Sequence, residues 1–154
     1  MPDTIEVASQ DAEALLLGRM INSGENRKTC CGFLRDHHFF FPEHCILFRS
    51  LSVLEAENKP CELHLLIEFL KKKELIDKVK GAPYLLELAQ TAPSSIDLES
   101  YSSILKECWA KRTAIEEVKK FSASLSKAQD VSTFLEEFSK KFVSISMDIT
   151  SKRL

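Results

Sequence analysis

Six histidine and cysteine side chains between residues 37 and 64 form the part of the sequence best suited to bind a metal ion. They are His37, His38, His44, Cys45, Cys61 and His64. Cys61 and His64 have the spacing of zinc ligands, and four nitrogen or sulfur ligands complete a zinc site. His44 and Cys45, however, would lie on neighbouring faces of one helix, and no second closely spaced pair is present. We therefore expect no metal, and a small zinc metalloprotein is kept as an alternative.

The remaining residues that could carry chemistry do not form a catalytic pattern. The five cysteines include no Cys-x-x-Cys pair, and the adjacent Cys30 and Cys31 do not bridge easily. No acidic residue is placed to orient a histidine beside Cys30 as a base. The sequence also lacks a glycine-rich phosphate loop and a Gly-x-Ser-x-Gly elbow. We expect no catalytic residue and no cofactor.

Charge and hydropathy exclude two further classes of protein. The net charge is −2, so there is no basic excess of the kind that marks a nucleic-acid-binding face. No apolar run approaches the roughly 20 residues that cross a bilayer. The first residues lack the basic end and apolar core of a secretory signal. The sequence predicts a cytoplasmic protein without a direct nucleic-acid site or a membrane segment.

Short apolar stripes predict that these side chains lie in a helical head, over residues 11–96, after a flexible leader over 1–10. Ser9 or Asp11 is placed to cap the first helix. Gly18 inside that helix predicts a close approach of a second helix, because glycine is costly there without such a reason.

Two further segments complete the head. Residues 26–28 are polar and predict a loop, and the next helix is expected to end near Asp36. His44 belongs to an apolar stripe that predicts another helix, with Pro42 at its start. No segment alternates with a period of two residues, so the sequence predicts an all-α fold.

The stretch from Gly81 to Leu105 divides the chain. Pro83 suits the first turn of a short helix, and Pro93 ends that helix because it disfavours the α conformation in the residue before it. Asp97 is then placed to cap a much longer helix. We expect the head to end here and a second unit to begin.

The apolar spacing over 97–150 predicts two long helices joined near Asp130 as an antiparallel hairpin, and residues 151–154 would begin a linker. In the first helix, Tyr101, Ile115 and Leu125 also fall at the heptad positions expected to face the second. The residues predicted for the hairpin seam or for dimerisation are Ile104, Cys108, Val118, Leu135, Phe138, Phe142 and Ile145.

Two aromatic residues of the first long helix fall outside this predicted seam. Trp109 is near the head, and we expect it to pack there. Phe121 lies about six turns along the helix, too far to reach the head, so a partner chain is expected to cover it.

Six short motifs follow one another along the chain. They are Asp11–Gly18 (DAEALLLG), His38–Phe48 (HFFFPEHCILF), Lys59–Leu66 (KPCELHLL), Gly81–Leu88 (GAPYLLEL), Pro93–Ser94 and Tyr101-x-x-Ile104. In this order, from about Ala12 to Ile149, the chain resembles the N-terminal domain of DnaB-type replicative DNA helicases. Departures from the family pattern mark a divergent member; they lie at Phe41, Cys45, Leu65, Lys80 and Asp97.

The resemblance implies a non-catalytic collar domain that assembles as a trimer of dimers and docks the C-terminal domain of primase. Its implied partners are further copies of itself, as a homodimer or hexamer, primase, and a helicase loader. Primase contacts would fall at positions matching Tyr84, Ile115 and Phe121. Ile115 would equally suit the hairpin core, and Tyr84 is expected half-buried with its hydroxyl outward. ATP and magnesium belong to the family's motor domain, which this sequence does not contain, so we expect no ATPase activity.

A related alternative keeps the binding role but changes the protein. The chain would then be the helicase-binding domain of a primase, or a free-standing adaptor, since both fit a head and hairpin. The Pro93–Ser94 and Gly-x-x-Tyr-Leu signals favour the helicase.

Overall fold

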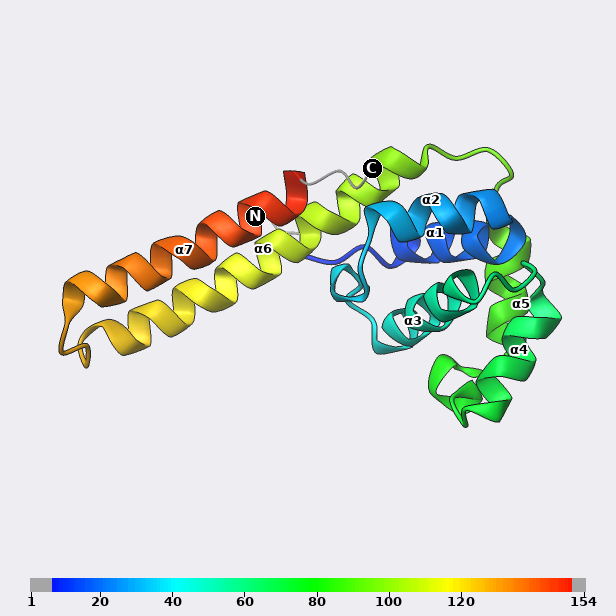
Figure 1. The fold of residues 1–154 in the computed structure, drawn as a ribbon, viewed down its shortest axis with the longest axis horizontal. Helices are drawn as coiled ribbons and strands as arrows, with labels where there is room; N and C mark the ends of the chain where they lie inside the picture. Colours follow the sequence, from blue (N-terminus) through cyan, green and yellow to red (C-terminus); the bar gives the residue numbers. More distant parts are fainter. Residues whose placement is uncertain (1–6, 151–154) are drawn as a thin grey trace, which may run out of the picture.

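The computed structural model describes residues 7–150, and the predictions for the first part of the leader and for 151–154 lie outside them. The described residues form only helices, which confirms the all-α fold. A head of short helices carries a long hairpin that projects from one side (Figure 1). The elements are α1 (Gln10–Asn22), α2 (Gly24–Phe33), η1 (Asp36–His38), α3 (Pro42–Ala56), α4 (Leu63–Lys72), η2 (Ile76–Val79), α5 (Gly81–Thr91), α6 (Leu98–Leu125) and α7 (Val131–Thr150), where η marks a 3₁₀ helix.

Side-chain caps fix where three of these helices begin. The Ser9 hydroxyl accepts the backbone N–H of Ala12 at 3.3 Å. Asp97 does the same at the start of α6, accepting from Ser100 at 3.1 Å, and Asp130 at the start of α7. Each cap satisfies an N–H group that has no partner within its helix. The structure confirms the expected cap at Asp97 and places the first cap at Ser9 rather than Asp11; Asp130 caps α7 at the expected join.

The predicted loop at residues 26–28 is wrong. The Ser23 hydroxyl accepts the N–H of Asn26 at 3.2 Å, so these polar residues lie inside α2 near its beginning. The same helix ends at Phe33, not at Asp36, because Leu34 is extended. The polar composition of residues 26–28 indicated a loop. Ser23, which precedes them, caps a helix, and this cap allows polar residues to form its first turns.

The core of the head is made by α1 to α5 and the first turns of α6. Its fully buried side chains include Leu16 and Leu17 of α1, Leu47 of α3 and Leu85 of α5. Leu105 of α6 belongs to the same cluster. No residue of α7 is buried. The head therefore gains its apolar burial without the second helix of the hairpin.

Helices α1 and α5 cross at Gly18. A Cβ atom at this position would lie 2.3 Å from the Leu88 carbonyl oxygen and 2.5 Å from the Ala92 Cβ. Close by, Asn22 donates its side-chain N–H to the Ala89 carbonyl at 2.6 Å. The close helix approach predicted from Gly18 is confirmed.

We predict that Gly18→Ala lowers the free energy of unfolding by about 1 to 3 kcal/mol, because the new methyl group meets a backbone carbonyl that cannot move alone. The matched control is Gly32→Ala in α2, where a Cβ meets nothing within 4 Å. That change should be neutral or stabilise by about 0.5 kcal/mol through helix propensity. Urea unfolding followed by circular dichroism measures both; equal midpoints for the two variants would contradict the crossing.

Candidate functional site

The cysteines of the candidate metal site bond to backbone carbonyls. Cys61 donates its thiol hydrogen to the Met20 and Ile21 carbonyls at 3.1 and 3.2 Å. Cys45 donates to the Phe39 carbonyl at 3.1 Å. Burial raises the pKa of both thiols, whereas a zinc ligand is a thiolate. His64 is exposed on α4. These residues stabilise local backbone and do not form the zinc site weighed as an alternative.

A buried polar network joins Glu13, His44 and Tyr84. Glu13 is 1% exposed and His44 is 0% exposed. The Glu13 carboxylate accepts the Phe40 N–H at 2.9 Å and lies 2.9 Å from His44 Nδ1. That leaves His44 Nε2 as the acceptor for the Tyr84 hydroxyl at 2.6 Å. The network connects α1, the entry to α3, and α5.

The Tyr84 hydroxyl therefore points inward, and the prediction of an outward hydroxyl is wrong. Burial, with the nearby carboxylates of Glu43 and Glu87, raises the pKa of Tyr84 to about 12, so the hydroxyl keeps its proton and donates it. The Lys80 ammonium lies 5.0 Å from the centre of the Tyr84 ring and 3.1 Å from Glu43. An acid, a histidine and a hydroxyl in this order resemble a nucleophile triad, but this hydroxyl is held against the base inside the head. The network positions the Tyr84 ring and gives no sign of catalysis.

The seam between α6 and α7 is aromatic. The Phe121 ring centre lies 3.9 Å from that of Phe138 and 5.4 Å from that of Phe134. Phe138 continues the seam to Phe142 at 4.5 Å. A Glu117–Lys141 ion pair at 3.3 Å borders it. The predicted seam positions Phe138, Phe142 and Ile145 are half-buried.

Phe121 lies in this seam, so the inference that only a partner chain could cover it is wrong. The face of α6 that meets α7 includes the polar residues Thr113, Glu117 and Ser124. Because apolar spacing identifies only apolar faces, it did not predict that this face forms the seam. Trp109, by contrast, packs against the head as predicted. Its ring centre is 4.9 Å from that of His37 and 5.5 Å from that of His38.

The apolar heptad positions of α6 point away from α7. Ile115 is 37% exposed and Val118 is 50% exposed, whereas Cys108 is buried near the head. The prediction that they face α7 is therefore wrong. We call the exposed apolar residues of α6 the outer row: Ile104, Ile115, Val118 and Leu125. Helix α7 adds exposed apolar residues of its own, at Val131, Leu135, Val143 and Met147. Leu135, also predicted for the seam, thus faces solvent.

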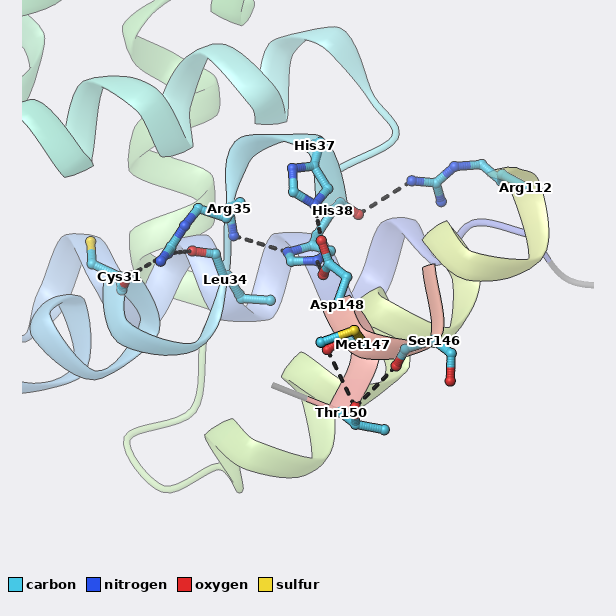
Figure 2. A network of polar contacts seen from close by, with 10 residues as sticks. All are labelled: Cys31, Leu34, Arg35, His37, His38, Arg112, Ser146, Met147, Asp148 and Thr150. Atoms are coloured by element: carbon cyan, nitrogen blue, oxygen red, sulfur yellow. Dashed lines mark hydrogen bonds and ion pairs between the residues drawn. The ribbon is translucent and has the colours of Figure 1, made fainter. Parts of the chain in front are cut away.

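Asp148, near the end of α7, meets two adjacent histidines of η1 (Figure 2). His38 Nε2 lies 2.6 Å from Asp148 Oδ1, and His37 Nε2 lies 2.9 Å from Oδ2. His38 Nδ1 accepts the backbone N–H of Arg35 at 2.9 Å. In neutral His38 the proton is therefore on Nε2, which donates to Asp148.

This tautomer also decides whether the cluster suits a metal ion. The candidate ligand atoms of His37, His38 and Asp148 lie within 4.8 Å of one another. A metal would need the lone pair of His38 Nε2, but that nitrogen carries the proton because the backbone occupies Nδ1. The cluster is a hydrogen-bonded contact between helices. Sequence reasoning missed Asp148, which has no local pattern to link it to residues 110 positions earlier.

His38 and Asp148 both have lowered pKa values, although only His38 is buried. Burial lowers the pKa of His38 below its ordinary 6.5, and Asp148 offsets only part of this effect. Burial alone would raise the pKa of Asp148, but hydrogen bonds from His38 and His37 hold it below its ordinary 3.8. A neutral histidine thus faces an ionised carboxylate at neutral pH.

Comparison with known proteins decides the family. A family model described as "DnaB-like helicase N terminal domain" matches residues 5–107, about two-thirds of the chain. The chain belongs to this family. The match covers the head and the first part of α6, so it includes Tyr84 but not Phe121 or α7. The resemblance on which the partner-site predictions were based is confirmed.

Relatives of the DnaB-like family extend the match into the hairpin. The replicative DNA helicase DnaB of Pasteurella multocida is 29% identical over 140 residues, covering 90% of this chain and 30% of that protein. A probable replicative DNA helicase of Trieres chinensis is 28% identical over 105 residues, 68% of this chain and 23% of that protein. The chain thus spans less than a third of the length of either relative.

Solved structures share the fold. The N-terminal domain of the Mycobacterium tuberculosis DnaB helicase matches with a TM-score of 0.80 at 23% identity, over 89% of this chain and 97% of that one. A DnaB-like replicative helicase, whose structure was described with its interactions with primase, matches with a TM-score of 0.69 at 21% identity. It covers 93% of this chain and 35% of that one. Within the described residues, no helix is long and apolar enough to cross a membrane.

We predict that stability falls as the pH drops below 6.5. His38 and Asp148 both have lower pKa values folded than unfolded, so the unfolded chain binds more protons and acid favours it. The His38 contribution is lost first, below 6.5, at up to about 1.4 kcal/mol per pH unit. The Asp148 contribution follows below 3.8, as the pH falls through its lowered pKa.

Urea midpoints at pH 7.5, 6.5, 5.5 and 4.5 measure this effect. The matched variant is His38→Asn, whose side-chain oxygen replaces Nδ1 as acceptor for Arg35 but does not titrate. His37, Asp148 and Lys106 are the charged or titratable groups acting on His38, and they remain in the variant. An identical pH slope in the variant and the wild type between 6.5 and 5 would contradict the assignment.

Proposed function

We propose that this chain is the non-catalytic N-terminal collar domain of a cytoplasmic replicative DNA helicase, which assembles with copies of itself and docks primase. Family membership supports the helicase assignment. It also disfavours the alternative of a primase helicase-binding domain, because the matched family is that of the helicase. The exposed apolar residues of the hairpin support the part of the proposal that concerns self-assembly.

The outer row is the observation that carries the assembly proposal. Its residues are separated by eleven, three and seven positions, which keeps them on one side of α6. The outer row is centred to one side of the aromatic seam, and its side chains keep 37 to 50% of their surface exposed. An extended row of exposed apolar residues marks a protein interface.

A second copy of the chain is the partner that suits this row. A twofold interface brings the same surface of two molecules together, so a row at helical spacing meets an identical row. Four exposed apolar residues on α7 extend the surface available to such a dimer. We infer that dimers formed through the hairpins are the unit from which the ring is built.

Primase docking rests on the family resemblance and on one hollow in the hairpin. An open hollow of about 280 Å³ lies between α6 and α7, lined by Phe121, Phe134 and Phe138 with charged residues around them. An apolar side chain of a partner could insert there. Tyr84 and Ile115 remain candidate contacts, and Ile115 also belongs to the outer row. A helicase loader is a further expected partner.

Self-association is predicted to depend on the outer row. Val118→Asp should weaken it at least about tenfold, because a buried unpaired carboxylate costs several kcal/mol. Ala123→Asp is the control, since it adds the same charge to an exposed position of α6 outside the row. Light scattering after size exclusion measures both, and circular dichroism checks that helicity is kept. A monomeric wild type at high concentration, or equal association of both variants, would contradict the proposal.

Primase docking needs a test that spares both the seam and the outer row. Phe121→Asp would place a carboxylate between stacked rings and disturb the hairpin itself. Ser124 lines the hollow and is exposed, so Ser124→Phe fills the hollow without removing a contact. We expect this change to weaken binding of the primase C-terminal domain at least about tenfold, through steric exclusion.

Ala123→Phe is the control for that experiment, because it places the same ring at an exposed position one residue away, outside the hollow. Calorimetric titration with the primase domain compares the two variants with the wild type. If Ser124→Phe and Ala123→Phe bind primase equally well, the hollow is not the docking site. If the wild type does not bind primase at all while self-association is intact, the docking part of the proposal fails and the assembly part stands.

A further inference from the structure

We propose that His37, His38 and Asp148 form a clasp that fixes the C-terminal turns of α7 to the head, and that opening it frees this end of the hairpin without unfolding the head. The clasp joins two segments, η1 and the end of α7, that lie far apart in the sequence (Figure 2). It does not depend on whether the chain works in a helicase.

The end of α7 packs against the rest of the chain without being fully buried. None of its residues is buried, and it contributes nothing to the head core. The aromatic contacts with α6 involve Phe134, Phe138 and Phe142, which precede the last two turns. Protein segments with few buried contacts open at low free-energy cost. The last turns therefore depend on the clasp more than the rest of α7 does.

Open hollows border the end of α7, so side chains fill only part of its contact with the head and α6. One, of about 390 Å³, is lined by Trp109, Thr113, Ile145 and the clasp residues His37 and Asp148. The other, of about 240 Å³, lies where Phe33 of α2 and Lys106 of α6 approach the end of α7. The polar bonds of the clasp cross this partly open contact and help to set the position of the helix end.

The η1 segment, which is the head side of the clasp, is held by hydrogen bonds from neighbouring residues. Arg35 donates from its guanidinium to the Leu34 and Cys31 carbonyls at 2.5 and 3.0 Å, and its backbone N–H is bound to His38. Arg112 of α6 donates to the His38 carbonyl at 3.3 Å. In Figure 2 the bonds from the Arg35 backbone and from Arg112 reach His38, while the Arg35 side chain bonds to the end of α2. With η1 fixed from α2 and α6, opening moves α7 and leaves the head in place.

The two histidines contribute unequally. His38 is 2% exposed, and its bond to Asp148 is shielded from water, whereas the His37 side chain is 42% exposed. An exposed pair adds little because water competes for both groups. His38 and Asp148 thus form the working pair, and closing it fixes the direction of α7 where the described helix ends at Thr150.

Hydrogen–deuterium exchange read by mass spectrometry tests the clasp on the full chain. We expect Asp148→Ala and His38→Asn to speed exchange at residues 145–150 at least about tenfold, because each removes the shielded bond. His38→Asn keeps an acceptor for the Arg35 N–H, so it does not uncap η1. Exchange in α1 to α5 should stay as in the wild type.

Two further variants sharpen the result. Ser146→Ala is the control on the same turn; its side chain is exposed and takes no part in the clasp. His38→Gln places an amide N–H near the position of Nε2 and should restore part of the protection that His38→Asn loses. Unprotected amides at 145–150 in the wild type would overturn the proposal. So would unchanged exchange in Asp148→Ala, or faster exchange across the whole head.

Discussion

The buried carboxylate of Glu13 is the interaction on which the arrangement of the head depends. It lies in α1, yet its partners are the backbone at Phe40, where the chain enters α3, and His44 one turn later. His44 in turn accepts a hydrogen bond from the Tyr84 hydroxyl of α5. A buried polar group is tolerated only with well-placed hydrogen-bond partners, and leaving one unsatisfied costs about 1 to 3 kcal/mol. Three helices must therefore meet in one arrangement.

That arrangement fixes the direction of the hairpin. With α5 held by Tyr84 and crossed by α1 at Gly18, the chain leaves the head at Pro93 and re-enters the core as the start of α6. The first turns of α6 are buried at Leu105, whereas Val118 on the same helix is exposed. One continuous helix thus belongs to the head at one end and forms a free surface at the other.

The sequence predicts well what is encoded locally. The caps at Ser9 and Asp97 and the glycine crossing follow from single residues and their neighbours. The hairpin was predictable as two helices, but not the side on which they meet. Apolar spacing shows which face avoids water, not which partner covers it. On α6 that face is the outer row, while the polar and aromatic face containing Phe121 meets α7.

Polar contacts between distant segments were beyond prediction for a related reason. Glu13 and His44 are 31 residues apart, and His38 and Asp148 are 110 apart. Neither pair has a local spacing rule that would connect its members. His38 and His44 by themselves suggested metal ligands, and only the fold shows that both ring nitrogens of each are already engaged. These two histidines join helices together.

Three of the five departures from the family pattern lie near the Glu13 network: Phe41, Cys45 and Lys80. The Phe41 ring packs edge-on against His44 with centres 5.6 Å apart, and Cys45 donates to the backbone beside it. Lys80 has a left-handed backbone with φ of 65° and lies over the Tyr84 ring. A side chain costs about 1 kcal/mol in that conformation, and the Glu43 ion pair offsets part of it. Beside these three residues, Glu13, His44 and Tyr84 bond to one another, so the departures border the network without breaking it.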